Sequence, residues 1–296
     1  MMLQPFPVRT AFLAVFLFLS PVSAQDPTAA ISGEIRLIVR GDDLGMTQGS
    51  LIAFERAFNE GILTCGGIAV PGPWFEGAAD LSRNHPNWCV GVHLAVIGEW
   101  VGCRWRPVLP WNSVRSIVDE DGFFFTSPSE LLSHNPKLED ITAECRAQIE
   151  LAVKKGVPVR YLDVHYLNDE IFGGIPGLDT ALFALAARYG VPFSGNAGEQ
   201  NRISVYTDPV GRKLESALKN LEELKPGLTL WVSHIGIDSP EQNALIHTKP
   251  EDRMPGPGVG KHRASELDVL LHPDVKAVIL KRGIRLVNYS ELQSGK

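Results

Sequence analysis

The residues with the clearest chemical potential in this sequence are two adjacent aspartates and three histidines, each placed after an apolar run. They are Asp42, Asp43, His93, His165 and His234. One carboxylate of an adjacent pair can bind a cation while the other accepts a proton from a bound water, provided that their surroundings differ. Two histidines and an aspartate supply the three protein ligands typical of a catalytic metal site, and a further histidine can act as a general acid. The pattern therefore indicates metal-assisted hydrolysis, in which the ion polarises a carbonyl and lowers the pKa of its water.

Each of these residues also has a purely structural interpretation. The aspartate pair can belong to a helix N-cap region, in which Thr47 is another candidate cap. A single histidine after a strand is more often a satisfied core or rim residue than a ligand. Asp163 either orients a histidine from behind or caps the end of its strand. The remaining histidines are interpreted as solvent-facing or structural: His85, His134, His247, His262 and His272.

The elements that must position these residues alternate between strand and helix. Repeated βα units imply a parallel sheet. Polar candidates at the ends of four different strands favour a barrel over an open doubly wound sheet, and no dinucleotide or phosphate-loop motif is present. The predicted fold is α/β, a single-domain irregular (β/α) TIM-like barrel. The predicted strands are 35–39, 62–70, 89–94, 159–164, 191–193, 228–233 and 284–287, and the predicted helices are 47–59, 75–83, 138–155, 179–188, 207–224 and 265–271.

A long segment between the third strand and the next long helix loses this periodicity. Residues 95–128 are rich in Trp, Pro and Gly, and a loop of this length inside a compact domain is usually functional. Trp100, Trp105 and Trp111 lie in it. They can form an aromatic platform for a sugar ring, or they can pack on the barrel rim.

The apolar run near the N-terminus indicates a targeting segment and not an element of the folded domain. Residues 11–19 read AFLAVFLFL, follow the single cation Arg9, and precede small residues that end at Ala24. The run is shorter than the roughly 20 residues that a membrane span needs. We expect a secretory signal peptide over 1–24, one barrel domain over 25–296, and a secreted or periplasmic protein. An uncleaved N-terminal anchor is the alternative.

Composition narrows the class of protein further. The chain has 296 residues, 44% of them apolar and 21% charged, which excludes collagenous, coiled-coil and largely disordered chains. Its net charge of −6 gives no basic excess for a nucleic-acid partner. The four cysteines form no CxxC pair, so a thiolate zinc site is not expected. Cys89 and Cys103 are close enough in sequence for a disulfide, and four free, buried thiols are the alternative.

Taken in order, these residues resemble the YdjC/ChbG carbohydrate deacetylase family. The similarity runs from about residue 35 to residue 292, and the ordered blocks together are specific. The family's NADDFG motif corresponds to 40–45 (RGDDLG), its N-x-G-I-x-T segment to 59–64 (NEGILT), its G-x-H-L to 91–94 (GVHL), its D-S-H-x-H-x-H to 163–169 (DVHYLND), and its late histidine to 234–236 (HIG).

The resemblance implies a metal-dependent deacetylase on a distorted barrel, with one divalent ion, Mg²⁺ or Zn²⁺, as its cofactor. It implies metal ligands at Asp43, His93 and His165, and a catalytic base at Asp42. His234 matches a histidine on the active face and is the candidate acid. Arg263 matches an arginine that orients a site carboxylate. Asp163, Arg263 and Trp100 complete the predicted set of substrate-contacting or supporting residues.

Three departures from the family pattern bear on the substrate. Arg40-Gly41 precedes the acidic pair, Leu167 and Asp169 replace two histidines, and Ile235 follows His234. Because those histidines are expected to line the cleft, the family's chitooligosaccharide substrate is not carried over. The predicted activity is removal of an acetyl group from an N-acetylated sugar or oligosaccharide. A hydrolase of another amide or ester, or a non-catalytic glycan-binding protein, is the alternative. The expected partner is that sugar. Neither a nucleic-acid partner nor a stable membrane span is expected, and a homodimer is left open.

Overall fold

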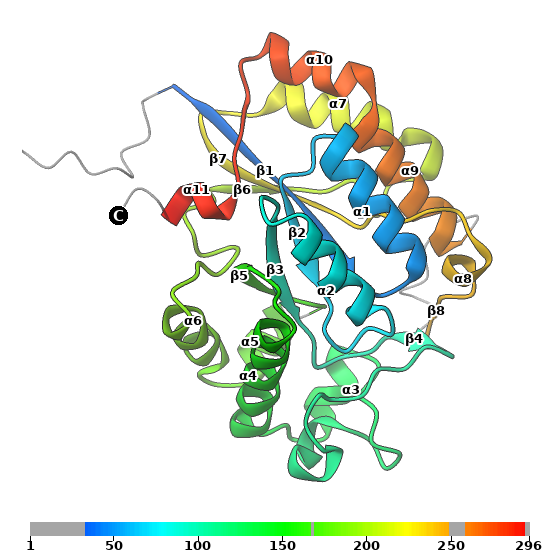
Figure 1. Cartoon of the computed structure of the whole chain (residues 1–296), viewed down its shortest axis with the longest axis vertical. Coiled ribbons are helices and arrows are strands. Elements are labelled where there is room, and N and C mark those ends of the chain that lie inside the picture. The colour runs from blue at the N-terminus through cyan, green and yellow to red at the C-terminus, as the bar shows by residue number, and fades with distance from the viewer. Residues whose placement is uncertain (1–32, 167–168, 249–257, 294–296) are drawn as a thin grey trace, which may run out of the picture.

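A sheet of parallel strands wrapped by helices forms the centre of the molecule (Figure 1). The computed structural model describes residues 33–166, 169–248 and 258–293. The strands lie in the order β5–β3–β2–β1–β7–β6, and β9 pairs with β1 beside this path. Every pairing in this sheet is parallel. Its strands are β1 (Ile35–Leu44), β2 (Cys65–Ile68), β3 (Cys89–Leu94), β5 (Val159–Val164), β6 (Asn201–Ile203), β7 (Gly227–Ser233) and β9 (Arg285–Leu286).

The segment 191–203 contacts β5, at one edge of the sheet, through its first residues, and its last residues form β6 at the other edge. Phe193 forms a parallel bridge with Leu162 of β5, and the Ser194 N–H donates to the Leu162 carbonyl at 2.8 Å. Further along, β6 pairs with β7. Within the described residues no pairing joins Phe193 to β6, so hydrogen bonds do not close the ring of strands. The predicted α/β class and irregular barrel are confirmed, and the predicted strand over 191–193 is reduced to this bridge.

Helices cover the outside of the sheet (Figure 1). In the view of Figure 1, α1 lies beside α9 and α7 beside α10, and these pairs are in contact. The helices are α1 (Gln48–Glu60), α2 (Phe75–Asn84), α3 (Pro128–Ser133), α4 (Leu138–Lys154), α5 (Asp169–Gly174), α6 (Leu178–Arg188), α7 (Lys213–Glu223), α8 (Pro240–Asn243), α9 (Val259–Leu271), α10 (Pro273–Lys281) and α11 (Tyr289–Gln293). None of the helices described is long and apolar enough to cross a membrane.

The start of α1 settles the structural interpretation of the acidic pair. Thr47 is the N-cap residue: its hydroxyl accepts the Ser50 N–H at 3.0 Å, and the Ser50 hydroxyl accepts the Thr47 N–H. This reciprocal arrangement is a capping box. Asp42 and Asp43 belong to β1 instead, which runs beyond the predicted end at residue 39 to Leu44. The aspartates are therefore available for chemistry.

The helices of the C-terminal half differ from the prediction in three places. The helix predicted from 207 begins at Lys213, after a 3-10 turn that follows Pro209. The sequence analysis missed α10, although Pro273 at its first position and Asp274 in its first turn are typical helix-start signals. A third prediction, the helix over 265–271, extends back to Val259 and so includes Arg263.

The long aperiodic segment 95–128 is packed onto the barrel instead of extending into solvent. Trp105 and Phe124 are buried, and the Phe124 N–H donates to the Trp105 carbonyl at 2.9 Å. Glu144 of α4 is fully buried and accepts the backbone N–H groups of Val108 and Leu109. These contacts satisfy polar groups that a buried loop would otherwise leave unpaired. Within the same segment, β4 (Trp100–Val101) pairs antiparallel with β8 (Ile246–His247).

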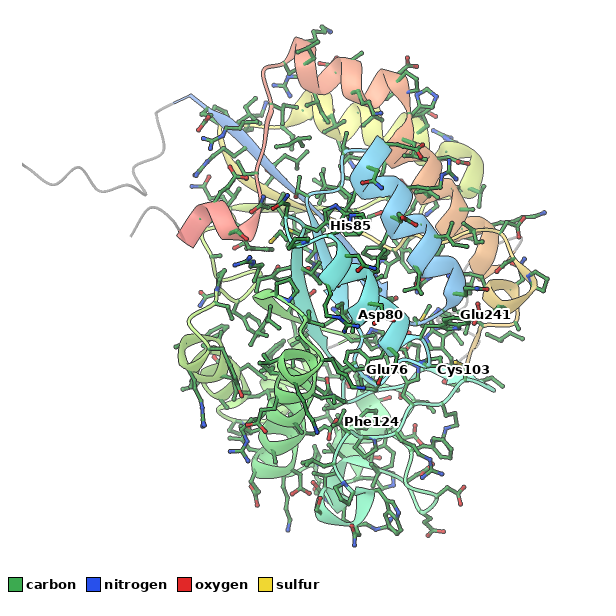
Figure 2. All side chains as sticks on the ribbon, in the orientation of Figure 1. Glu76, Asp80, His85, Cys103, Phe124 and Glu241 are labelled. Atoms are coloured by element: carbon green, nitrogen blue, oxygen red, sulfur yellow. The ribbon has the colours of Figure 1, made fainter. Side chains whose placement is uncertain are left out.

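All four cysteines are free thiols. Cys65 and Cys89 are register partners on neighbouring strands β2 and β3, inside the barrel. Cys103 lies near Glu241 (Figure 2), and burial together with that carboxylate raises the pKa of the Cys103 thiol. The alternative of four free thiols therefore describes the structure, except that Cys103 is only partly buried, and the Cys89–Cys103 disulfide does not form in it.

Candidate active site

Strand alternation brings the candidate residues to one end of the barrel interior. Ile38 of β1 belongs to the apolar cluster inside the barrel. Because side chains alternate between faces along a strand, Asp42, four residues further on, points inward as well. The same phase holds on β3, β5 and β7, where His93, His165 and His234 each follow a member of that cluster by four residues.

Asp43 faces the same side as Asp42 because the strand is irregular there. The pairing of β1 with β2 shifts register between Gly41 and Leu44, and Asp43 has a φ of 68°. A regular strand would send adjacent side chains to opposite faces. A positive φ is costly for a residue other than glycine, and such strain is concentrated at functional sites. Here it places two carboxylates in one cavity.

Asp43, His93 and His165 present three potential ligand atoms to one point. Asp43 Oδ1 lies 3.1 Å from His165 Nδ1 and 3.4 Å from His93 Nε2, and the two ring nitrogens are 3.2 Å apart. Ligand atoms about 2.0–2.2 Å from one tetrahedral ion are separated by roughly 3.3–3.6 Å. The distances between these atoms are therefore close to those between the ligand atoms of a bound divalent cation. The family resemblance predicts the same three residues as ligands.

Further features of the described side chains fit such an ion. Asp43 Oδ1 is buried and forms no hydrogen bond within the described part of the chain. Burial alone would raise the pKa of the Asp43 carboxyl, but Arg263 and the two histidine rings hold that pKa well below its usual range. A carboxylate whose ionised form is favoured, beside two imidazoles, is a donor set that zinc and similar divalent ions accept.

Each of these three candidate ligands is held by a charged partner on its other side. His93 Nδ1 lies 2.9 Å from Asp163 Oδ2, His165 Nε2 lies 2.8 Å from Glu99 Oε2, and Arg263 Nη2 donates to Asp43 Oδ2 at 2.7 Å. Partners of this kind set the tautomer and orientation of metal-binding rings. Asp163 and Arg263 thus contact the candidate ligands His93 and Asp43. The sequence analysis missed Glu99, because it lies in the aperiodic segment and has no spacing signal.

The carboxylates make this part of the cavity attractive for positive charge. Burial by itself lowers the pKa of the His165 imidazole, but Glu99 and Asp43 outweigh it and raise that pKa to about 9. Burial likewise opposes the charged form of His93, yet Asp163 and Asp42 raise its pKa well above the usual range. Ring protons or a metal ion can supply the positive charge that these carboxylates favour.

Asp42 is held by a neighbour that the sequence analysis treated only as a departure from the family motif. Arg40 Nε and Nη2 donate to the two Asp42 oxygens, each at 2.7 Å. Burial alone would raise the pKa of the Asp42 carboxyl, but Arg40 lowers it below its ordinary value. A carboxylate that is ionised and fixed in one orientation can accept a proton from a water in the cavity.

His234 stands at the end of β7 and is positioned through its backbone. Its N–H donates to Glu266 Oε2 at 2.8 Å, and its ring centroid lies 4.2 Å from that of Tyr206. The buried ion pair between Glu266 and Lys213 fixes this arrangement. Burial lowers the pKa of the His234 imidazole, although Asp43 and Asp42 oppose the shift. Its Nδ1 atom makes no hydrogen bond within the described residues.

A cavity of about 940 Å³ brings the candidate side chains together. Its volume lies at the upper end of the usual range for small-molecule sites, roughly 300–1,000 Å³. Its lining includes Asp42, Asp43, His93, Asp163, His165, His234 and Arg263, together with the aromatic residues Tyr166, Phe172, Phe183, Phe193 and Tyr206, and His247. The predicted site residues therefore meet in one place, except for Trp100.

Trp100 is fully buried and packs behind the cavity lining. Its ring centroid lies 4.4 Å from that of His247 and 5.6 Å from the guanidinium carbon of Arg263. The rim-packing alternative thus describes this residue better than a sugar platform. His247, which the sequence analysis interpreted as structural or solvent-facing, does line the cavity. Of the two departures in the histidine run, Asp169 lines the cavity and Leu167 lies outside the described residues.

The fold and the site together define a class: an irregular α/β barrel with an aspartate and two histidines that could hold a divalent ion. The model of the family "YdjC-like protein" matches residues 36–281. The chain belongs to this family. The predicted family resemblance is thereby confirmed.

Individual relatives agree with this assignment. A carbohydrate deacetylase from Brevibacillus brevis is 27% identical, covering 87% of this chain and 100% of the relative. One from Thermus thermophilus is 30% identical, covering 84% and 91%. A crystal structure from Enterococcus faecalis, described as a candidate cellobiose-phosphate cleavage protein, matches with a TM-score of 0.70 at 22% identity, over 88% of this chain and 99% of the other. That structure supports the fold.

Proposed function

We propose that this protein is a metal-dependent carbohydrate deacetylase that hydrolyses the acetamide of an N-acetylated sugar or oligosaccharide. The observation that carries the proposal is the meeting of three ligand atoms, 3.1–3.4 Å apart, with Asp42 and His234 in one cavity. The relatives named carbohydrate deacetylase support the same activity. A divalent ion such as Mg²⁺ or Zn²⁺, held by Asp43, His93 and His165, would supply Lewis-acid polarisation of the acetyl carbonyl and a water of lowered pKa.

Asp42 is the proton acceptor in this proposal. It is ionised and held by Arg40, so it can take a proton from the attacking water as the water adds to the acetyl carbon. Asp163 and Glu99 hold the two histidine rings, and Arg263 holds Asp43, so the geometry needs little rearrangement when a substrate binds. The chain supplies this preorganisation from strands β1, β3 and β5, from the loop positions of Glu99 and His165, and from helix α9.

His234 is the proton donor to the leaving nitrogen. An amine is a poor leaving group unless it is protonated as the carbon–nitrogen bond breaks. His234 lines the same cavity, and burial makes its imidazolium a stronger acid than a solvent-exposed one. The products are acetate and a sugar with a free amino group.

The test is mass spectrometry of acetylated oligosaccharides after incubation with the metal-loaded protein. Loss of one acetyl group from N-acetylated sugars, abolished by a chelator and restored by the divalent ion, is the expected result. Cleavage confined to O-acetyl esters or to other amides would favour a different hydrolase on the same barrel. Glycan binding without turnover at any divalent metal would favour a non-catalytic glycan-binding protein.

The site of action proposed for this enzyme is outside the cytoplasm. The predicted signal peptide over 1–24 lies outside the described residues, so the proposal rests on the sequence of that segment. Intact-mass measurement of the protein recovered after expression in a secreting host tests it. Cleavage after Ala24 is expected, and recovery of the full-length chain in the membrane fraction would indicate the uncleaved anchor. The domain bounds 25–296 and a homodimer stay predictions.

A further inference from the structure

Two groups of side chains in the cavity have the composition and spacing of a cation site, and they share His93. The first group is Asp43, His93 and His165, and the second is Asp42, His93 and Asp163. All of these residues are buried. Carboxylate and imidazole ligands suit a divalent ion in either group. Ligand chemistry alone therefore leaves open which group binds metal, and whether both do.

The guanidinium of Arg40 lies inside the second group. Its Nε atom is 2.7 Å from Asp42 Oδ1 and 3.0 Å from Asp163 Oδ2, and its Nη2 atom is 2.7 Å from Asp42 Oδ2. A further contact anchors it, because Nη1 donates to Ser194 Oγ at 2.6 Å. Arg40 is only 5% exposed. A permanent positive charge thus already occupies the place that a second metal ion would need.

The charge of the buried groups agrees with a single divalent ion. Four carboxylates and two guanidinium groups leave a net charge of −2 when the imidazoles are neutral, and one divalent cation balances it. Without Arg40 the same groups would carry −3. The groups counted are Asp42, Asp43, Glu99 and Asp163 with Arg40 and Arg263, and each is at least nine-tenths buried. Burying uncompensated charge costs free energy, so the net charge of these groups limits how many metal ions the cavity can bind.

We propose that Arg40 is a positioning residue that acts as a fixed internal cation in the second group. By occupying the space between Asp42 and Asp163, it limits the centre to one divalent ion, bound through the first group. It also keeps Asp42 free of metal, in one orientation, to accept a proton. The part about proton transfer rests on the proposed function, whereas the metal count does not. Arginine suits this position because its planar fork reaches two carboxylates and stays charged.

The experiment counts metal ions in Arg40 variants of the full chain. Each protein is dialysed to equilibrium against Zn²⁺, and bound zinc is measured by mass spectrometry. The wild type and Arg40→Lys are expected to bind one ion. Arg40→Gln, which keeps an amide donor but loses the charge, is expected to bind two. Adding Asp163→Asn to Arg40→Gln should return the count to one. Arg146→Gln, at an exposed site on α4, is the matched control and should bind one.

Several outcomes would overturn the proposal. A single ion in a folded Arg40→Gln protein, or two ions in the wild type, contradicts the role of Arg40 in limiting occupancy. Circular dichroism and thermal melting establish that each variant is folded.

If Arg40→Gln does not fold, the kinetic constants of Arg40→Lys provide the test instead. An ammonium cannot pair with both Asp42 oxygens and with Asp163, so kcat should fall by about 10- to 100-fold while KM stays unchanged. An unchanged kcat would overturn the positioning role. A wild type that binds one ion and deacetylates no sugar would contradict the proposed function but leave the metal count intact.

Discussion

Asp163 Oδ2 lies 2.9 Å from Nδ1 of His93, on the opposite side of the ring from the ligand atoms of Asp43 and His165. In the neutral ring this contact makes Nδ1 the donor and leaves the Nε2 lone pair for a cation. Asp163 lies in β5 and His165 directly follows that strand, so one segment supplies a candidate ligand and the residue that orients another.

Replacing Asp163 with asparagine should therefore weaken metal binding. The amide is a poorer acceptor and carries no charge, so His93 becomes a less basic ligand, and loss of such a partner typically costs about 10- to 100-fold in affinity. Isothermal titration with Zn²⁺ measures the change. Asp274→Asn, at an exposed carboxylate, is the control and should bind as the wild type does. Equal affinities for the two variants would show that Asp163 does not tune the ligand.

Asp42→Asn should separate turnover from metal binding. The amide has nearly the shape of the carboxylate but cannot accept a proton, so kcat should fall by about 10²- to 10⁴-fold. Metal affinity should change little, because Asp42 is outside the first group of ligand atoms. Rates on an N-acetylated oligosaccharide and zinc titrations of the same preparation provide the two readouts. Near-wild-type activity would mean that another group is the base.

His234→Ala should affect substrates according to their leaving group. An amine must be protonated as it leaves, so hydrolysis of the acetamide should fall by about 10²- to 10⁴-fold. A nitrophenyl acetate has a leaving group that needs no proton, so its hydrolysis should stay close to the wild-type rate. Parallel assays of both substrates test this role. An equal loss on both would indicate that His234 acts in binding or in structure instead.

Much of the site could be predicted because strand periodicity determines which residues meet. Four strands that end in polar residues at the same phase must bring those residues to one end of a barrel, whatever the details of the loops. The periodicity did not extend to Asp43, which shares the cavity with Asp42 only because its φ is 68°. A register shift of this kind depends on the neighbouring strand, and no local pattern in the sequence predicts it.

The supporting residues were harder to predict because their partners are distant in the chain. Glu99 lies 66 residues before His165 in sequence, in a segment without periodicity, and acquires its role through the packing of that segment. His247 looks isolated in the sequence, yet its pairing with Trp100 in the small antiparallel sheet places it at the cavity. Arg40 was visible only as a departure from the family motif. Its role depends on where Asp163 lies in three dimensions.

Metal binding should release protons and should weaken as the pH falls. The neighbouring carboxylates raise the pKa values of His93 and His165, that of His165 to about 9, so the charged rings, whose protons an ion must displace, persist to higher pH than a free imidazole would. Apparent affinity should therefore rise with pH until the rings are neutral. Titrations with Zn²⁺ at pH 7, in two buffers of different ionisation enthalpy, give the number of protons released. His234→Ala should release the same number, and a count of zero would contradict the assignment of these ligands.

The buried pair of Lys213 and Glu266 should contribute far more to stability than a surface pair of the same length. Lys213 Nζ lies 3.0 Å from Glu266 Oε1 with both side chains fully buried, and Lys281 Nζ lies 3.0 Å from Glu222 Oε1 with both largely exposed. Lys213→Met leaves a carboxylate charge in the interior, which typically costs about 3–5 kcal/mol, whereas Lys281→Met removes an exposed pair that contributes roughly 0–1 kcal/mol. Denaturant unfolding of the two variants measures both free energies. Similar values would show that the other contacts of Glu266, from Ser233 and the backbone of His234, are enough to stabilise its charge.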